Sequence, residues 1–416
     1  MGLRATNMRQ ERIGRGGRTI SLLLAAVVAA LAGADWRQFR GSDNTGVSTE
    51  KVRLPVSFAA DHDIAWKVPL PGRGPSGPIV VGGRVVVTCS SGARQERLHL
   101  LCFSAADGKC LWQREFWATG NTLAHDVAAV AIPTPASDGR RIFAFYSSND
   151  LACVDLDGNL LWFRGLGYEH PNTRNAVGMS SSPLLLGDTV IVQLDSPGQS
   201  LLAGIDASSG TTRWHTDREA NAVFASPTLF GAAALIQGKT SLVAVEPRNG
   251  QVLWKYDYET PYQPVASAAT WRDTVFLPGF KLSALRPGAA GEEAKLLWAE
   301  TRLRPDMASP IVCDGRIYVL KGSGVLACGD AASGRTYWQL RLKGTFWASP
   351  VCADGRLYCV NREGLVQVVQ LGKKEGKLLT SSRIDDGISA SPAVAEGAVF
   401  FRSDRHLWKI AAKSSP

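Results

Sequence analysis

The feature that most constrains the fold is a strand-rich segment that returns about every 40 to 50 residues along the chain. Each copy opens at a Ser-Pro or similar pair and continues through short apolar strands. It then reaches a turn of the form Asp/Glu-x-x-x-Gly, with a Trp four residues after the Gly. The Gly and Trp recur together at Gly108/Trp112, Gly158/Trp162, Gly210/Trp214, Gly250/Trp254 and Gly334/Trp338. A fixed period of this length, built only of strand-like pieces, predicts a β-propeller.

The strand-opening positions indicate the number of blades. They are Pro78, Pro135, Pro183, Pro227, Ala268, Pro310, Pro350 and Pro392, which makes eight. The last repeat has room for three strands only, and an apolar strand at 64–70 precedes the first opening. We expect this N-terminal strand to complete the C-terminal blade and close the ring, which leaves no unpaired edge inside it. The predicted fold is all-β, an eight-bladed propeller of four-stranded antiparallel blades.

Local chemistry agrees with blades of this kind. Dipeptides suited to tight hairpins, such as Asp138-Gly139 and Asp314-Gly315, separate the first two strands of several repeats. One third-strand position stays small, as Cys102, Cys153, Gly204, Ala244, Ala284 and Cys328. We interpret the repeated Trp residues as core side chains that fill the wedge between neighbouring blades.

The first 34 residues are typical of a secretory signal. Five arginines precede an apolar run at 20–31, which is short for a bilayer span, and Ala32-Gly33-Ala34 fits a cleavage site before Asp35. An uncleaved membrane anchor is the alternative. No Cys lies near the cleavage point, so lipoprotein processing is not indicated. We therefore predict an exported protein of the periplasm or cell envelope, with no transmembrane span after cleavage. Residues 35–63 form an N-terminal extension, and residues 64–416 form a single propeller domain.

Charge and cysteine content exclude several classes of function. The whole-chain net charge of +9 falls to +5 without the +4 of the leader, and no Lys/Arg run remains, so a nucleic-acid partner is not expected. Three of the eight cysteines share the small third-strand position, which favours buried thiols. Cys102 with Cys110, or Cys352 with Cys359, could meet across strands, and their connectivity stays open. The spacings match neither covalent haem nor zinc binding.

The repeat resembles that of the pyrroloquinoline-quinone (PQQ) enzyme-like propellers. It stands here as Gly204-Ile-Asp206 with Gly210 and Trp214, as Ala244-Val-Glu246 with Gly250 and Trp254, and as Cys328-Gly-Asp330 with Gly334 and Trp338. This family includes quinoprotein alcohol dehydrogenases and the non-enzymatic BamB-like component of outer-membrane protein assembly. The opening at 35–41 and the stretch at 69–74 are similar to exported propellers of planctomycete bacteria.

The resemblance implies two functions of different classes. A PQQ dehydrogenase needs oxygen ligands for Ca²⁺, an Asp base beside the alcohol and an aromatic platform under the quinone. Many such enzymes also carry an adjacent Cys-Cys pair, which this chain lacks, and its blades are near-minimal. We therefore predict a monomeric, non-catalytic, BamB-like scaffold without a cofactor, which binds a protein or peptide partner at the funnel face. A PQQ-dependent quinoprotein dehydrogenase with calcium is the alternative.

Candidate site residues lie in the crossings between blades, because loops on a rigid scaffold usually carry function. Two crossings, 113–134 and 163–182, are long and polar. The candidates for the funnel or partner site are His125, Asp126, His170, Arg174, Asn175, Arg218, Asp306 and Trp347. The two long crossings also have a structural interpretation: His125 and Asp126 could brace their loop, and Arg174 could pair with a neighbouring blade. We assign no catalytic residue and no metal ligand.

Overall fold

A computed structural model describes residues 35–59, 62–125, 128–173 and 178–412 of the chain. The predicted signal peptide and three candidate site residues, Asp126, Arg174 and Asn175, lie outside the described residues. All described residues belong to one compact unit, Ala34–Pro416. This described part is all-β apart from one short helix, α2 (Leu166–Glu169). No helix of the described residues has the length and apolar character needed to cross a membrane.

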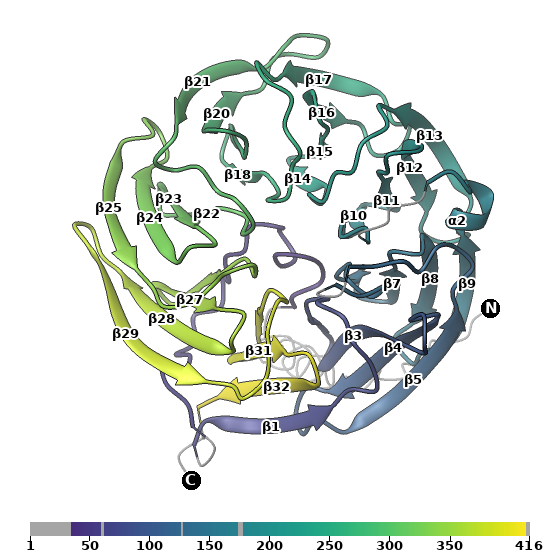
Figure 1. The fold of residues 1–416 in the computed structure, drawn as a ribbon, viewed down its shortest axis with the longest axis horizontal. Coiled ribbons are helices and arrows are strands. Elements are labelled where there is room, and N and C mark those ends of the chain that lie inside the picture. Colours follow the sequence, from purple (N-terminus) through teal and green to yellow (C-terminus); the bar gives the residue numbers. More distant parts are fainter. Residues whose placement is uncertain (1–34, 60–61, 126–127, 174–177, 413–416) are drawn as a thin grey trace, which may run out of the picture. The chain divides into compact units, whose positions relative to one another are not determined.

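Eight four-stranded sheets form a ring, which confirms the predicted fold (Figure 1). Blade 1 holds β2 (Ile79–Val81), β3 (Arg84–Ser91), β4 (Arg97–Ser104) and β5 (Cys110–Trp117), and blade 2 holds β6 (Ala136–Ser137), β7 (Arg141–Phe145), β8 (Asp150–Asp155) and β9 (Leu160–Gly165). Blade 3 holds β10 (Leu184–Leu186), β11 (Thr189–Leu194), β12 (Ser200–Asp206) and β13 (Thr212–Arg218), and blade 4 holds β14 (Thr228–Phe230), β15 (Ala233–Gln237), β16 (Ser241–Val245) and β17 (Val252–Asp257).

The second half of the ring repeats the pattern. Blade 5 holds β18 (Ala269–Trp271), β19 (Thr274–Leu277), β20 (Leu282–Arg286) and β21 (Lys295–Glu300), and blade 6 holds β22 (Ile311–Cys313), β23 (Arg316–Leu320), β24 (Val325–Asp330) and β25 (Thr336–Arg341). Blade 7 holds β26 (Val351–Ala353), β27 (Arg356–Val360), β28 (Leu365–Leu371) and β29 (Gly376–Arg383), and blade 8 holds β30 (Ala393–Ala395), β31 (Ala398–Arg402) and β32 (His406–Ala411) with β1 (Ile64–Pro69).

The ring closes where the sequence predicts. β1 pairs antiparallel with β32, with Trp66 opposite Lys409 and Val68 opposite Leu407. The N-terminal strand is therefore the outermost strand of the blade that holds the C-terminal strands, and Figure 1 shows the two side by side. Because the two ends of the repeat array share one sheet, the ring cannot open without breaking that strand pair.

The repeated Trp and Gly act across blade boundaries. A Cβ atom on Gly158 would lie 2.6 Å from the indole of Trp112, and the Trp112 Nε1 donates a hydrogen bond of 2.9 Å to the Leu156 carbonyl. The same packing joins Trp66 with Gly108, Trp162 with Gly210, Trp214 with Gly250, Trp298 with Gly334 and Trp338 with Gly376. These six Gly residues therefore have no room for a side chain, because the indole of the preceding blade covers each of them.

Strand direction divides the propeller into two faces. Successive strands of each blade are antiparallel, so the crossings between blades and the turns between second and third strands share one face, which we call the crossing face. The Asp/Glu-x-x-x-Gly turns and the turns between first and second strands share the other, which we call the hairpin face. The inner strands surround a central channel that runs between these two faces.

Residues 35–50, which we call the plug, close the channel at the hairpin face; Figure 1 shows this segment inside the ring. Trp36 bridges to Val80 in blade 1, and the Gly46–Ser48 backbone hydrogen-bonds to Cys352 in blade 7. Across its length the plug touches an inner strand or its turn in every blade, at Val80, Ser137, Leu185, Leu229, Ala268, Pro310, Cys352 and Glu396. One short segment therefore ties all eight blades together at one end of the channel.

Candidate functional site

The axis of the propeller holds a cavity of about 430 Å³ that opens at the crossing face. Phe39 of the plug forms its floor, hydroxyl side chains from the starts of the inner strands form its wall, and crossing-loop residues form its rim. The rim is mainly apolar and includes Ile132, Phe224, Met307 and Trp347. A preformed concave site with an apolar lining and a few convergent polar groups is the usual form of a ligand site.

The wall is a hydrogen-bonded ring of hydroxyl groups. Each hydroxyl oxygen accepts the backbone N–H of the equivalent residue in the preceding blade, as Ser226 Oγ accepts the Ser182 N–H at 2.9 Å. The acceptors are Thr134, Ser182, Ser226, Ser267, Ser309, Ser349 and Ser391, at 2.9 to 3.0 Å. We call these seven residues the hydroxyl ring. It satisfies the buried N–H groups at the starts of the inner strands, which would otherwise lose their hydrogen bonds on leaving water.

The hydroxyl ring is open at one position. Blade 1 places Gly77 where the other blades place Ser or Thr, and a Cβ atom there would lie 3.0 Å from the Ser391 carbonyl. The Gly77 N–H still donates to Thr134 Oγ1 at 3.0 Å. Each ring oxygen accepts one N–H and keeps its O–H hydrogen and a second lone pair. The wall therefore offers neutral hydrogen-bond donors and acceptors rather than charge.

A buried arginine lies at the plugged end of the ring. The Arg40 guanidinium donates to the Ala268 carbonyl at 2.7 Å and to the Pro310 carbonyl at 2.6 Å, and the residue is 4% exposed. Burial lowers the pKa of Arg40 to about 10, which leaves it charged at neutral pH. No carboxylate of the described residues forms an ion pair with it. Arg40 thus joins blades 5 and 6 to the plug through carbonyl groups alone.

Two of the candidate residues line the cavity. Trp347 lies at the rim, with the Arg362 guanidinium 3.9 Å from its ring centroid, a cation–π contact that holds the indole in place. His125 comes from the long crossing between blades 1 and 2 and is exposed at the rim. The structure therefore places two side chains that are far apart in the sequence at the same opening of the central cavity.

Three other candidates make their contacts away from the cavity. Arg218 forms an ion pair with Asp195, with Arg218 Nε 3.0 Å from Asp195 Oδ1, and burial of this carboxyl raises its pKa although Arg218 opposes the rise. Asp306 accepts the Gly322 N–H at 2.8 Å. His170 follows α2, with its ring centroid 6.4 Å from that of His215. None of the three lines the central cavity.

The hydroxyl ring was missed by the sequence interpretation, which treated the Ser-Pro pairs only as strand openings. The signal was present: a Ser or Thr directly precedes the opening residue in seven of the eight repeats, and a Gly does so in the first. A residue that precedes a Pro favours extended backbone, which explains the strand opening. It does not explain why that residue carries a hydroxyl group. The shared position of these residues at the channel wall explains the hydroxyl.

The described lining does not fit a calcium-bound quinone. Ca²⁺ is held by six to eight oxygens, carboxylates prominent among them. The described residues of the cavity wall and rim supply hydroxyls, one imidazole, a thioether and apolar groups, and no carboxylate. No group of three or more His, Cys, Asp or Glu side chains within the described ranges could hold a metal ion. The arrangement suits binding through neutral hydrogen bonds and apolar contact.

Comparison with known proteins adds relatives in two functional groups. A family model described as outer membrane protein assembly factor BamB matches residues 37–192, 172–281 and 289–370. The outer membrane protein assembly factor BamB of Alkalilimnicola ehrlichii is 28% identical over 195 residues, which are 44% of this chain and 43% of that protein. The match thus spans less than half of that relative.

Solved structures share the fold at low sequence identity. A europium-containing methanol dehydrogenase superposes with a TM-score of 0.68 at 14% identity, over 88% of this chain and 89% of its own. BamB from Moraxella catarrhalis superposes with a TM-score of 0.60 at 16% identity, over 88% of this chain and 99% of its own. Identities this low establish a common propeller architecture and leave function to the site itself.

Proposed function

Since the chain belongs to the family described as outer membrane protein assembly factor BamB, we propose that it is a non-catalytic binding propeller of the cell envelope. Its partner is a protein or peptide segment that enters the central cavity from the crossing face. The relative from Alkalilimnicola ehrlichii is named for outer-membrane protein assembly. The leader-like first 34 residues support export of this chain to the same kind of compartment.

The chemistry of the cavity wall carries this proposal. The hydroxyl ring offers neutral donors and acceptors, which can pair with the carbonyl and N–H groups of a peptide. The apolar rim around Phe224, Met307 and Trp347 offers contact for side chains. General acid–base or nucleophilic catalysis needs an activated group beside the substrate. The wall hydroxyls accept backbone N–H groups, and the described lining includes no carboxylate. Recognition without chemistry is the function that this lining supports best.

Photo-crosslinking in cells of the native organism tests the proposal. A photoreactive amino acid replaces Met307, which is 41% exposed at the rim, and in a matched variant it replaces Val252, which is 49% exposed on an outer strand. We expect discrete crosslinked species from the rim position only. Adding Trp347→Ala to the rim variant should weaken them. Crosslinks of equal pattern at both positions, or none at the rim, would contradict a funnel partner.

The alternative, a PQQ-dependent dehydrogenase, is separated by titration of the purified protein with PQQ and Ca²⁺. We expect no saturable binding at about micromolar concentration, because the described wall supplies neither carboxylate ligands for calcium nor cations for the quinone carboxylates. Saturable binding together with alcohol-dependent dye reduction that is lost on chelation would replace the scaffold proposal by the enzyme.

A further inference from the structure

A second cavity, of about 470 Å³, lies between blades 4 and 5 on the crossing face and away from the central axis. One side is the end of β17 with the crossing that follows it, which carries Tyr256, Tyr258 and Tyr262. The other side is the turn between β19 and β20, which carries Phe280 and Lys281. We call this cavity the aromatic groove. Its backbone is fixed, because the Tyr258 and Tyr262 N–H groups donate to the Thr240 and Lys239 carbonyls at 2.8 Å.

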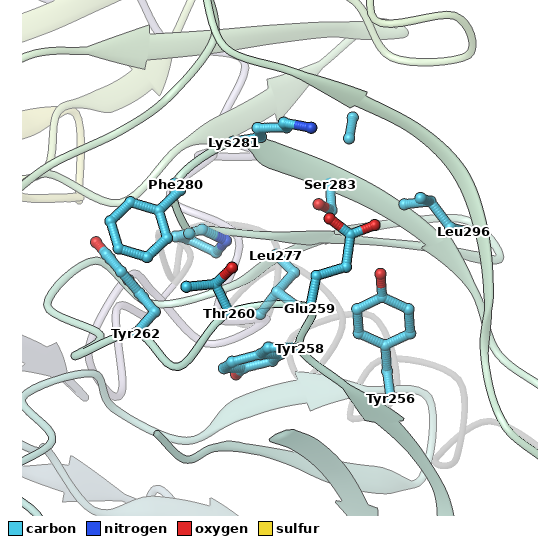
Figure 2. A pocket seen from close by; sticks show the side chains of 13 residues that line it. Tyr256, Tyr258, Glu259, Thr260, Tyr262, Leu277, Phe280, Lys281, Ser283 and Leu296 are labelled. Atoms are coloured by element: carbon cyan, nitrogen blue, oxygen red, sulfur yellow. The ribbon is translucent and has the colours of Figure 1, made fainter. Parts of the chain in front are cut away.

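Aromatic rings surround the groove from several sides. Tyr262 and Phe280 pack edge to face with ring centroids 5.4 Å apart, and Phe280 is still 50% exposed. Figure 2 shows these two rings on one side, Tyr256 on the other, and the Glu259 carboxylate between them. The Tyr258 hydroxyl is buried, so this residue contributes its ring rather than its polar tip. Exposed aromatic faces in a concave site are costly in water and available to a ligand.

The repeat does not specify these aromatic residues, as the neighbouring cleft shows. The cleft between blades 3 and 4 holds a cavity of about 230 Å³ built from the equivalent repeat positions. Two and four residues after the repeat Trp, it has Thr216 and Arg218 where the aromatic groove has Tyr256 and Tyr258. The third residue of the adjoining turn is Thr240 there and Phe280 in the groove. The aromatic lining is therefore not part of the repeat: the two clefts share the same repeat positions and differ in their side chains.

Two side chains of opposite charge complete the lining. Glu259 and Lys281 both line the groove, and neither forms an ion pair with a residue of the described chain. Arg304 adds a second cation, 5.7 Å from the Phe280 ring centroid. The groove therefore presents a carboxylate acceptor and cationic donors together, which suits a ligand that can both donate and accept hydrogen bonds.

We propose that the aromatic groove binds a neutral saccharide. The C–H face of a sugar ring carries partial positive charge and packs on the negative faces of aromatic rings. The sugar hydroxyls can donate to the Glu259 carboxylate and accept from the Lys281 ammonium, and such charge-assisted hydrogen bonds are stronger than neutral ones. The site is separate from the central cavity, so saccharide binding here does not depend on whether the funnel binds a peptide.

Calorimetric titration of the full-length protein tests the site with three neutral probes: maltohexaose, cellohexaose and the hexamer of N-acetylglucosamine. We expect at least one to bind with a Kd of about 1 mM or lower. Tyr256→Ala and Phe280→Ala should each weaken that binding by about tenfold or more. Tyr168→Ala is the matched control, because Tyr168 is 80% exposed on α2 and lies outside the groove.

Glu259→Gln gives a test that does not depend on an aromatic truncation. It keeps the size of an exposed side chain, and it should weaken the saccharide by about threefold or more while the melting temperature is unchanged. The proposal is overturned if none of the three probes binds up to about 10 mM. It is also overturned if the groove variants bind like the control, or if a proline-rich peptide saturates the groove and the saccharides do not.

Discussion

The two ends of the central channel are surrounded by the same eight inner strands, and they are finished in opposite ways. At the hairpin face, the plug inserts Trp36 and Arg40, each 4% exposed, and hydrogen-bonds to every blade. At the crossing face, the hydroxyl ring leaves a cavity open beneath exposed crossing loops. A repeated blade defines the channel, and a non-repeated segment decides which end is available to a ligand.

The two ends also differ in how their polar groups are satisfied. At the plugged end, buried carbonyls of the inner strands accept from a charged guanidinium. At the open end, buried N–H groups donate to hydroxyls of the next blade. Removing a buried hydrogen-bond partner costs more when the group left behind cannot reach water. Mutations at the plugged end should therefore lower the free energy of unfolding. Mutations at the rim of the open end should instead weaken ligand binding.

Removal of the plug should have the largest effect. Deletion of residues 35–58, which are the plug and the segment that follows it, exposes the surfaces that cover Trp36, Leu54 and Phe58, which are 4%, 4% and 7% exposed. Loss of buried large apolar side chains costs about 3 kcal/mol or more each, so we expect at least about 5 kcal/mol in total. Urea unfolding measures this loss in the free energy of unfolding. A variant with an unchanged midpoint and unchanged slope would show that the ring is stable without its plug.

Arg40→Met tests the charged anchor of the plugged end. The change leaves the Pro310 carbonyl without its donor and the Ala268 carbonyl with the Thr228 hydroxyl alone, and we expect a loss of about 2 kcal/mol in the free energy of unfolding. Arg37→Ala is the control, because Arg37 is a more exposed member of an ion pair with Asp35 and should cost less than about 1 kcal/mol. Equal losses for the two variants would refute the special role of the buried guanidinium.

Ser226→Ala tests the hydroxyl ring. It removes the acceptor of the buried Ser182 N–H and should lower the free energy of unfolding by about 1 kcal/mol. Ser209→Ala, at an exposed turn of the hairpin face, should change it by less than about 0.5 kcal/mol. Hydrogen exchange of the Ser182 amide provides a local measurement. Protection that is the same in Ser226→Ala and in the unmodified protein would contradict the hydrogen bonding of the ring.

Trp347→Ala should have the smallest effect on stability. The side chain lies at the rim and its main specific contact is the cation–π pair with Arg362, worth about 0.5 to 1 kcal/mol. Partner crosslinking at the rim should fall sharply in the same variant. A melting temperature that drops by many degrees, with crosslinking retained, would move Trp347 from the binding surface to the framework.

The sequence predicted the blades because each blade depends on local signals that recur. Strand alternation, tight-turn dipeptides and the Gly-to-Trp interval all act within about ten residues, and eight copies make the pattern unmistakable. Ring closure through 64–70 followed from counting strands, and β1 pairs with β32 as expected. Crossing-loop candidates were less predictable, because the length and polarity of a loop do not fix its direction. Trp347 reaches the funnel, whereas Arg218 turns to a carboxylate of its own blade.

By itself the sequence determined the architecture of this protein: the period, the number of blades, the closing strand and the Trp that packs between blades. Only the tertiary structure decided where binding can occur. The hydroxyl ring, the plug and the aromatic groove each join residues from different blades, more than 15 and in places more than 200 positions apart. Their chemistry exists only once ring closure sets the radius at which neighbouring blades meet, and no local propensity encodes that distance.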